Sequence, residues 1–338
     1  MTEIIDKIST LGLSTETRVS WAETLDPAVK QAREALSRQS KKPSRILELD
    51  FETTGKEGIY LFPGYEGVEV FQLGQSRNPK DQFLRGASAH GVAFGLTQVR
   101  MGSETRLINV AVKPFYEEDE IPEGSADNKR GRDKARYEAI VNGIVLDRGF
   151  STTEPLCLVI DQGDGYIITP VKKGVQSLDT DLWHQFLHGT QWIRQHFLNR
   201  LAGVAKEAAD LNYHGINHAD GALRNYWTTL SGTIEAFDWE SASVTTNPPS
   251  PDKLIQIGVS TLRPLYRSIA KSEDRDDPKT VGIIRGPKKT RWKEFDQMVF
   301  TPYTVQMMKN LDSNQLLTDE YVEAIEAVEE ALKEKIGI

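Results

Sequence analysis

The sequence predicts an α+β fold in which a β-rich half precedes a helix-rich half. Between residues 46 and 112, short β-prone runs are separated by glycines, which is the pattern of a sheet. Beyond Gly174, apolar residues recur at steps of three and four, as one buried face of a helix requires. The chain has 338 residues, more than a single hydrophobic core usually accommodates, so two lobes are expected.

The first part of the chain is expected to be a helical extension with a linker. Residues 17–38 have a helical pattern that Pro27 interrupts at a position suited to the first turn of a helix, and a basic, proline-containing stretch follows. The expected division is therefore a helical extension and linker (1–45), a β-rich N-lobe (46–174) and a helical C-lobe (175–338).

The N-lobe is expected to contain a series of short strands and one helix. A polar segment at 117–134 predicts an exposed insertion, and the helix after it, 135–149, is expected to end at Gly149 because glycine favours a helix end. The expected strands cover residues 45–51, 58–62, 68–73, 91–100, 106–112, 155–163 and 165–171.

The C-lobe begins its regular pattern with a long helix at 191–211, and Gly215 provides its stop. A β-prone run at 232–241 follows. The last helix, at 318–336, has Thr318 as its expected N-cap. The basic stretch 285–293 is interpreted as a solvated loop. The apolar positions of the long helix are Ile193, Phe197, Leu201, Val204, Ala208 and Leu211.

Composition excludes several classes of protein. An apolar fraction of 38% with 27% charged residues is typical of a soluble chain, and no apolar run approaches the roughly 20 residues of a membrane span. A net charge of −8 argues against general nucleic-acid binding. The N-terminus has no pattern of an export signal, and the single cysteine, Cys157, suits a reducing cytoplasm and a buried structural thiol. A cytoplasmic protein is expected.

Polar residues gather in the loop after the long helix. The loop carries Asp220 and Asn225, and a second carboxylate, Asp238, follows an apolar run. An amide and a carboxylate on neighbouring segments offer the oxygen ligands that Mg²⁺ prefers beside substrate phosphates. The remaining Asp220 is then available as a base.

The order of these residues resembles a known family. A His-x-Asp-x-x-x-x-Asn pattern starting at His218, followed by a strand that ends in Asp238, resembles the catalytic loop and metal-binding Asp of the protein kinase-like superfamily. The resemblance implies that Asp220 orients and deprotonates the accepting hydroxyl. It also implies that Asn225 and Asp238 hold Mg²⁺ and that His218 braces the loop.

The upstream sequence adds to this resemblance, which covers about residues 80–270. The run 106–115 resembles the third strand of a kinase N-lobe, with Lys113 as the lysine that contacts ATP phosphates and Glu138 as its ion-pair partner. Acidic residues of the insertion are rivals for that partnership. Residues 85–95 resemble the glycine-rich loop, where Gly86 and Gly91 match its first and last glycines and Ser88 replaces the middle one. The implied fold is two-lobed and kinase-like, and residues 172–179 would form its hinge.

The segment after Asp238 favours one branch of the superfamily. It reads Asp-Trp-Glu, it is short, and Asp252 at the next helix start resembles the loop-supporting Asp of the aminoglycoside phosphotransferase and choline kinase branch. An Ala-Pro-Glu motif is absent from the sequence, which favours a small-molecule acceptor over a protein. Arg224 argues the other way, because it resembles the tyrosine-kinase form of the loop.

The expected activity is therefore transfer of the γ-phosphoryl group of ATP, with Mg²⁺, to a hydroxyl of a small molecule. One alternative is a Ser/Thr/Tyr protein kinase or an autophosphorylating kinase. An alternative of another class is a nucleotide-binding or protein-interaction module that keeps the kinase fold without turnover, although all the polar site residues are present. Histidines four residues apart, 184 with 188 and 214 with 218, leave a zinc site as a further alternative.

Overall fold

The computed structural model describes residues 58–61, 67–74, 93–101, 103–115, 131–161, 164–171, 176–178, 191–229, 232–270, 283–284 and 286–338. The chain divides into two compact units, Met1–Lys173 and Gly174–Ile338. The extension expected at 1–45, the strand expected at 45–51 and most of the insertion expected at 117–134 lie outside the described residues.

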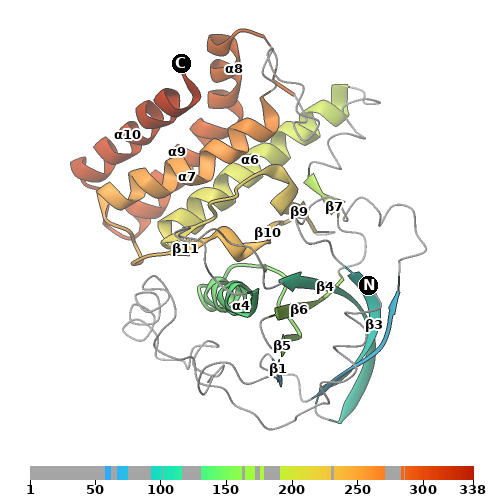
Figure 1. Ribbon diagram of the computed structural model, residues 1–338. Coiled ribbons are helices and arrows are strands. Elements are labelled where there is room, and N and C mark those ends of the chain that lie inside the picture. Colours follow the sequence, from blue (N-terminus) through green and yellow to red (C-terminus); the bar gives the residue numbers. More distant parts are fainter. Residues whose placement is uncertain are drawn as a thin grey trace, which may run out of the picture. The chain divides into compact units, whose positions relative to one another are not determined.

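The first unit contains a six-stranded antiparallel sheet (Figure 1). The strands lie in the order β1-β5-β6-β4-β3-β2, so the longest one, β4, has a neighbour on each side. The strands expected from the sequence after residue 57 are confirmed. Their bounds are β1 (Gly58–Leu61), β2 (Gly67–Gly74), β3 (Ala93–Met101), β4 (Glu104–Phe115), β5 (Cys157–Asp161) and β6 (Asp164–Pro170).

One helix of the first unit, α4 (Gly131–Asp147), packs against β4, β5 and β6. Its residues from 135 to 145 are all buried, including the polar side chains of Arg136, Glu138 and Asn142. The helix begins four residues earlier than expected, and it ends at Asp147, two residues before the expected end at Gly149. Gly149 has a left-handed φ of 86°, and the next amide, that of Phe150, donates to the carbonyl of Val145 at 3.1 Å.

Helices dominate the second unit. The face of α6 expected to be apolar is buried from Phe197 to Leu211, and α6 packs on α9 while α7 packs on α10 (Figure 1). A π-helical turn, Asp296–Phe300, joins α8 to α9. The helices are α6 (Gln191–Tyr213), α7 (Pro251–Ile269), α8 (Lys288–Phe295), α9 (Thr301–Ser313) and α10 (Asp319–Ile336).

Short antiparallel strand pairs of the second unit position the loops of interest. β8 (Ile216–Asn217) pairs with β11 (Ser243–Val244), and β9 (Tyr226–Thr228) pairs with both β10 (Ile234–Ala236) and β7 (Gln176–Ser177). The chain therefore passes from β8 through residues 218–225 to β9, and from β10 through residues 237–242 to β11. With helices and antiparallel strands in one chain, the α+β class is confirmed.

The basic stretch 285–293 is not the solvated loop that its charge indicated. Most of it belongs to α8, because Trp292 and Phe295 are three residues apart and both bury against the core. The ring of Phe295 meets that of Tyr266 edge-on at 5.1 Å. The prediction was wrong because two aromatic residues among many charges leave only a weak periodic signal.

Two smaller predictions are resolved. Thr318 does precede α10 as its N-cap, but its side chain makes no capping hydrogen bond. Cys157 is buried as expected, and burial raises the pKa of its thiol to about 12, so the thiol stays protonated and structural. Within the described part of the chain, no helix combines the length and apolar composition needed to cross a bilayer.

Gly215 ends α6 under a tight constraint, which gives a test. Its φ is 69°, and a Cβ there would lie 2.1 Å from the carbonyl oxygen of Thr246. Gly232 has a similar φ of 85° with nothing within 4 Å of its Cβ position. We expect Gly232→Ala to lower the free energy of unfolding by about 1 kcal/mol from backbone conformation alone. Gly215→Ala should lower it by about 3 kcal/mol or more, since backbone must also move.

Urea denaturation of the two variants, followed by far-UV circular dichroism, measures both losses against the unsubstituted chain. Equal losses in the two variants would show that the contact with Thr246 does not constrain Gly215.

Candidate active site

The first unit joins two residues that the resemblance paired. Lys113, near the end of β4, donates from Nζ to Oε2 of Glu138 on α4 at 2.8 Å. The side chains are only 16% and 10% exposed, so the pair is largely shielded from water. The ammonium group also lies 5.0 Å from the centre of the Phe115 ring. A shielded pair with such geometry holds both charged groups in defined positions.

The expected glycine-rich loop, with Gly86, Ser88 and Gly91, lies outside the described residues. Their assignment to phosphate binding stays a prediction.

In the second unit, the loop after β8 holds Asp220 by side-chain contacts within the loop. Oδ2 of Asp220 accepts a hydrogen bond from Nη2 of Arg224 at 2.7 Å and one from Nδ2 of Asn225 at 3.0 Å. The same Nδ2 donates to the backbone oxygen of Asp220 at 2.7 Å. A 3₁₀ turn, Leu223–Asn225, brings these residues back toward Asp220.

Asn225 has a defined orientation. Both atoms that its amide approaches on Asp220 are oxygens that only accept, so the group facing them is the NH₂ group. The amide oxygen, Oδ1, then points elsewhere, and it accepts no hydrogen bond from the described residues. Since Nδ2 is already engaged, Oδ1 is the atom of this buried side chain that can coordinate a cation.

Asp238 lies just beyond the end of the β9–β10 hairpin. The amide of Phe237 donates to the carbonyl of Asn225 at 3.0 Å, which extends the pairing of the hairpin by one residue. Asp238 itself has φ 68° and ψ 69°, a left-handed conformation that costs a non-glycine residue about 1 kcal/mol. Such strain persists where surrounding structure enforces it and is common at functional sites.

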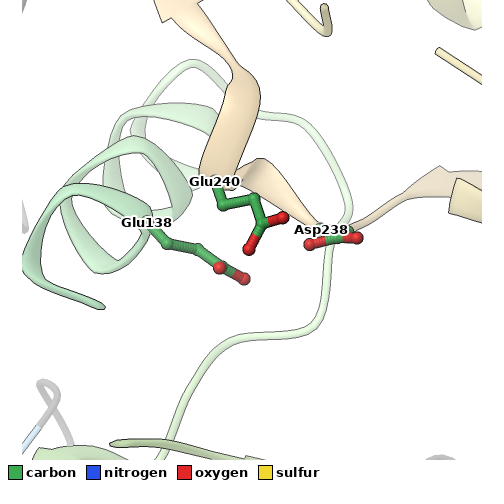
Figure 2. Close-up of side chains that lie close together, drawn as sticks. All are labelled: Glu138, Asp238 and Glu240. Atoms are coloured by element: carbon green, nitrogen blue, oxygen red, sulfur yellow. The ribbon is translucent and has the colours of Figure 1, made fainter. Parts of the chain in front are cut away.

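Figure 2 shows a second carboxylate close to that of Asp238. Glu240, two residues further along, is exposed, and an oxygen of its carboxylate lies within 4.8 Å of one from Asp238. Glu240 is not among the site residues expected from the sequence. The sequence feature that could have indicated this pair is the spacing of Asp238 and Glu240, which are separated by one residue just after β10. A 3₁₀ turn, here Trp239–Ser241, can bring two carboxylates at that spacing together.

His218 links the loop to the segment that carries Asp238. Its ring is fully buried, and Nε2 lies 2.8 Å from the carbonyl oxygen of Phe237. Because a carbonyl only accepts, Nε2 carries the proton and donates. The ring also packs against that of Trp239, with centroids 4.8 Å apart. Burial lowers the pKa of His218 despite the opposing effects of the Phe237 carbonyl and of the Asp238 and Asp220 carboxylates, so the ring stays neutral near pH 7.

Two other sequence interpretations concern this region. Asp252, expected to support the loop, is exposed in the first turn of α7. The side chains of α7 that bond to the loop or to β8 belong instead to residues 260–268.

The zinc alternative pairs His214 with His218, but the two rings have separate partners. Nδ1 of His214 lies 3.1 Å from Nδ2 of Asn247, and Nε2 of His218 bonds to Phe237. His184 and His188 lie outside the described residues.

Comparison with known proteins adds little. No protein-family model matches the chain, and no curated protein matches it. Among solved structures, 1274 chains match. One is described as WaaP in complex with acyl carrier protein, with a TM-score of 0.36 and 13% sequence identity over 76% of this chain and 99% of that chain. A similarity at this level carries no argument about function.

An acidic residue of α6, near the β9–β10 hairpin, has an unusual pKa that the sequence does not indicate. Burial, together with the nearby carboxylates of Asp210 and Glu235, raises the pKa of Glu207 on α6 to about 8. Glu235 is itself buried and accepts a hydrogen bond from Nε1 of Trp227 at 2.9 Å. Glu207 is therefore protonated at pH 7 in the folded chain. In the sequence it is one of many helical glutamates, so no local pattern marks it.

The raised pKa of Glu207 predicts a pH-dependent stability. A folded pKa of about 8 against a reference value of 4.5 means that the folded state binds more protons than the unfolded chain between these values. The contribution of Glu207 to the free energy of unfolding therefore falls as pH rises from about 4.5 to about 8. Glu207→Gln removes this contribution, so the variant should gain stability relative to the parent as pH rises.

Urea denaturation of both proteins from pH 5 to pH 9 measures the difference. Glu326→Gln, which removes an exposed carboxyl of α10, is the matched control and should show no such trend. A difference between Glu207→Gln and parent that does not change with pH contradicts the assignment.

Proposed function

We propose that the chain is a kinase-like phosphotransferase that moves the γ-phosphoryl group of ATP to a hydroxyl of a small molecule. The observation that carries the proposal is the arrangement at the end of the β9–β10 hairpin. There Asp220, Oδ1 of Asn225 and Asp238 come from two loops that the His218–Phe237 hydrogen bond ties together. Hard oxygen ligands beside a carboxylate available as a base are what phosphoryl transfer needs, because its catalysis is mainly positioning and charge stabilisation.

The residues of the hairpin end take different roles in this proposal. Asp220 orients the acceptor hydroxyl and accepts its proton. Oδ1 of Asn225 and the carboxylate of Asp238 would hold Mg²⁺, and the nearby carboxylate of Glu240 adds a further oxygen donor. When bound, Mg²⁺ supplies positive charge to the phosphate oxygens. The neutral ring of His218 keeps the two loops in register.

Residues of the first unit complete the proposal. Lys113, held by Glu138, would contact the phosphates of ATP, and Gly86, Ser88 and Gly91 would cover them. The proposed architecture is a two-lobed kinase-like fold with a nucleotide-binding N-lobe at 46–174 and a helical C-lobe at 175–338. Its proposed partners are ATP and the acceptor, without nucleic acid or membrane, and its proposed place is the cytoplasm.

A small acceptor is favoured by the short path after Asp238. The chain passes through the turn Trp239–Ser241 and β11 and reaches α7 at Pro251, so this segment offers little length for docking a peptide. Arg224 supports the second candidate, a protein kinase, because its guanidinium pairs with the proposed base. A kinase-like module without turnover is the third, and activity measurements separate it from the others.

Phosphoryl transfer can be tested without knowing the acceptor. We expect the purified chain with γ-labelled ATP and Mg²⁺ to transfer label to a component of the metabolite fraction of a cell extract. Asp220→Asn should reduce the rate by about 10²- to 10⁴-fold, the usual contribution of general acid–base catalysis. Lys113→Met should reduce it as well, by loss of phosphate contacts.

The distribution of label decides between the candidates. Label in the protein fraction, or on the chain itself, favours the protein kinase or autophosphorylating kinase. ATP binding without any transfer favours the inactive module. No binding of Mg-ATP by calorimetry rules out both kinases and leaves only a protein-interaction module that binds no nucleotide.

The metal assignment has its own test. Asn225→Ala and Asp238→Asn should each weaken binding of Mn²⁺ in the presence of ATP by at least about tenfold, because each removes an oxygen donor or a charge. Electron paramagnetic resonance of free Mn²⁺ measures the affinity. Asn310→Ala removes an amide that bonds to Asp210 on α6 and is the matched control. Unchanged affinity in both site variants would remove Asn225 and Asp238 from the metal site.

A further inference from the structure

The loop that carries Asp220 rests on one face of α7. Three residues of this helix, two of them adjacent and the third about two turns further along, bond to the loop or to the strand before it. Ser260 accepts from Nδ2 of Asn217 at 3.3 Å, Thr261 donates to Oδ1 of Asn217 at 3.1 Å, and Ser268 accepts from the amide of Leu223 at 3.4 Å. The contacts begin before His218 and end after Asp220, so they enclose the loop.

Thr261 is the centre of a buried polar network. Its hydroxyl donates to Oδ1 of Asn217 and accepts from Nδ2 of Asn212 at 3.0 Å. Asn212, near the end of α6, also donates to the carbonyl of Ile216 and accepts from the hydroxyl of Tyr303 on α9. Thr261 and Asn212 are almost fully buried. Loss of the Thr261 hydroxyl would therefore leave polar atoms unpaired away from water.

Gly221, directly after Asp220, makes the closest approach between the loop and α7. A Cβ at this position would lie 2.6 Å from the carbonyl oxygen of Thr261. That oxygen belongs to the helix backbone and cannot turn aside as a side chain would. The backbone conformation of Gly221 is ordinary, since it is not among the glycines with positive φ. Glycine is therefore required at this position by the close contact with α7 and not by backbone conformation.

We propose that Thr261 and Gly221 are positioning residues that fix the location of Asp220. The hydroxyl of Thr261 acts through its hydrogen bond to Asn217. Gly221 acts by allowing the loop to lie close to the backbone of α7. The proposal rests on the proposed function, because it concerns the placement of the proposed base. Among the residues that the structure describes, the side chains that bond to Asp220 belong to its own loop, to Arg224 and Asn225. Its place relative to the rest of the second unit therefore depends on how the loop itself is seated.

The test compares kcat and KM for ADP formation from Mg-ATP, with the metabolite fraction of a cell extract as the source of the hydroxyl acceptor. Thr261→Val keeps the shape of the side chain and removes the hydroxyl, whereas Thr261→Ser keeps the hydroxyl. We expect Thr261→Val to lower kcat by about tenfold or more with KM for ATP changed less than about twofold, since a displaced base affects the transition state more than nucleotide binding. Thr261→Ser should restore kcat. Ile325→Val, which trims a buried residue of α10, is the control for general loss of stability.

Gly221→Ala tests the same placement without removing any polar atom. It should lower kcat as Thr261→Val does, and it keeps the proposal testable if Thr261→Val fails to fold. Gly203→Ala, whose added Cβ would meet only the side chain of Ile234 at 3.1 Å, should leave kcat unchanged. Hydrogen exchange of peptides covering residues 216–227 should rise in Thr261→Val and Gly221→Ala and in neither control.

The outcomes separate the two proposals. If Asp220→Asn abolishes ADP formation while Thr261→Val and Gly221→Ala keep the kcat of the parent, the positioning role is wrong and the proposed function stands. A loss of kcat in Ile325→Val equal to that in Thr261→Val also overturns it, because stability alone would then explain the effect. If Asp220→Asn leaves ADP formation unchanged, the proposed function fails and the positioning role falls with it.

Discussion

The hydrogen bond from His218 to the carbonyl of Phe237 is the constraint on which the candidate site depends. The donor ring is fully buried, so breaking the bond would leave its N–H group unpaired away from water. It acts together with the bond from the Phe237 amide to the carbonyl of Asn225. Both backbone groups of one residue are thus engaged by the loop, which leaves Asp238 to turn away through a left-handed conformation. The site geometry follows from satisfying the backbone at a hairpin end.

The helices behind the loop hold its ends in place. Polar side chains from α6, α7 and α9 meet around Asn212 and Thr261 in a network whose members pair with one another. A satisfied buried network favours one arrangement of its elements over others, because each alternative leaves some group unpaired. Chemistry-bearing residues can then sit on a loop, since a rigid scaffold holds its ends.

Local patterns were enough to predict much of the fold and the order of the site residues. The described strands, the buried face of α6 and the helix end at Gly149 each depend on neighbours in sequence, which periodicity and glycine reveal. The pairing of Lys113 with Glu138 came from a family resemblance and spans two elements. The pKa of Glu207 and the seating of Gly221 on Thr261 arise from residues distant in sequence, so no local pattern carries them. In α8 the charges outnumber the two aromatic residues that decide its burial.

The pair formed by Asp220 and Arg224 bears on how the proposed base works. Oδ2 of Asp220 already accepts hydrogen bonds from Arg224 and Asn225, so an acceptor hydroxyl must share this oxygen or use the other one. Phosphoryl transfer through a loose transition state needs little nucleophile activation before the phosphate begins to leave. The pair is about one-third exposed, and such pairs contribute only about 0–1 kcal/mol, so an incoming hydroxyl can share or displace Arg224 at small cost. Asp220 in this proposal therefore orients the acceptor first and accepts its proton once the phosphoryl group has begun to leave.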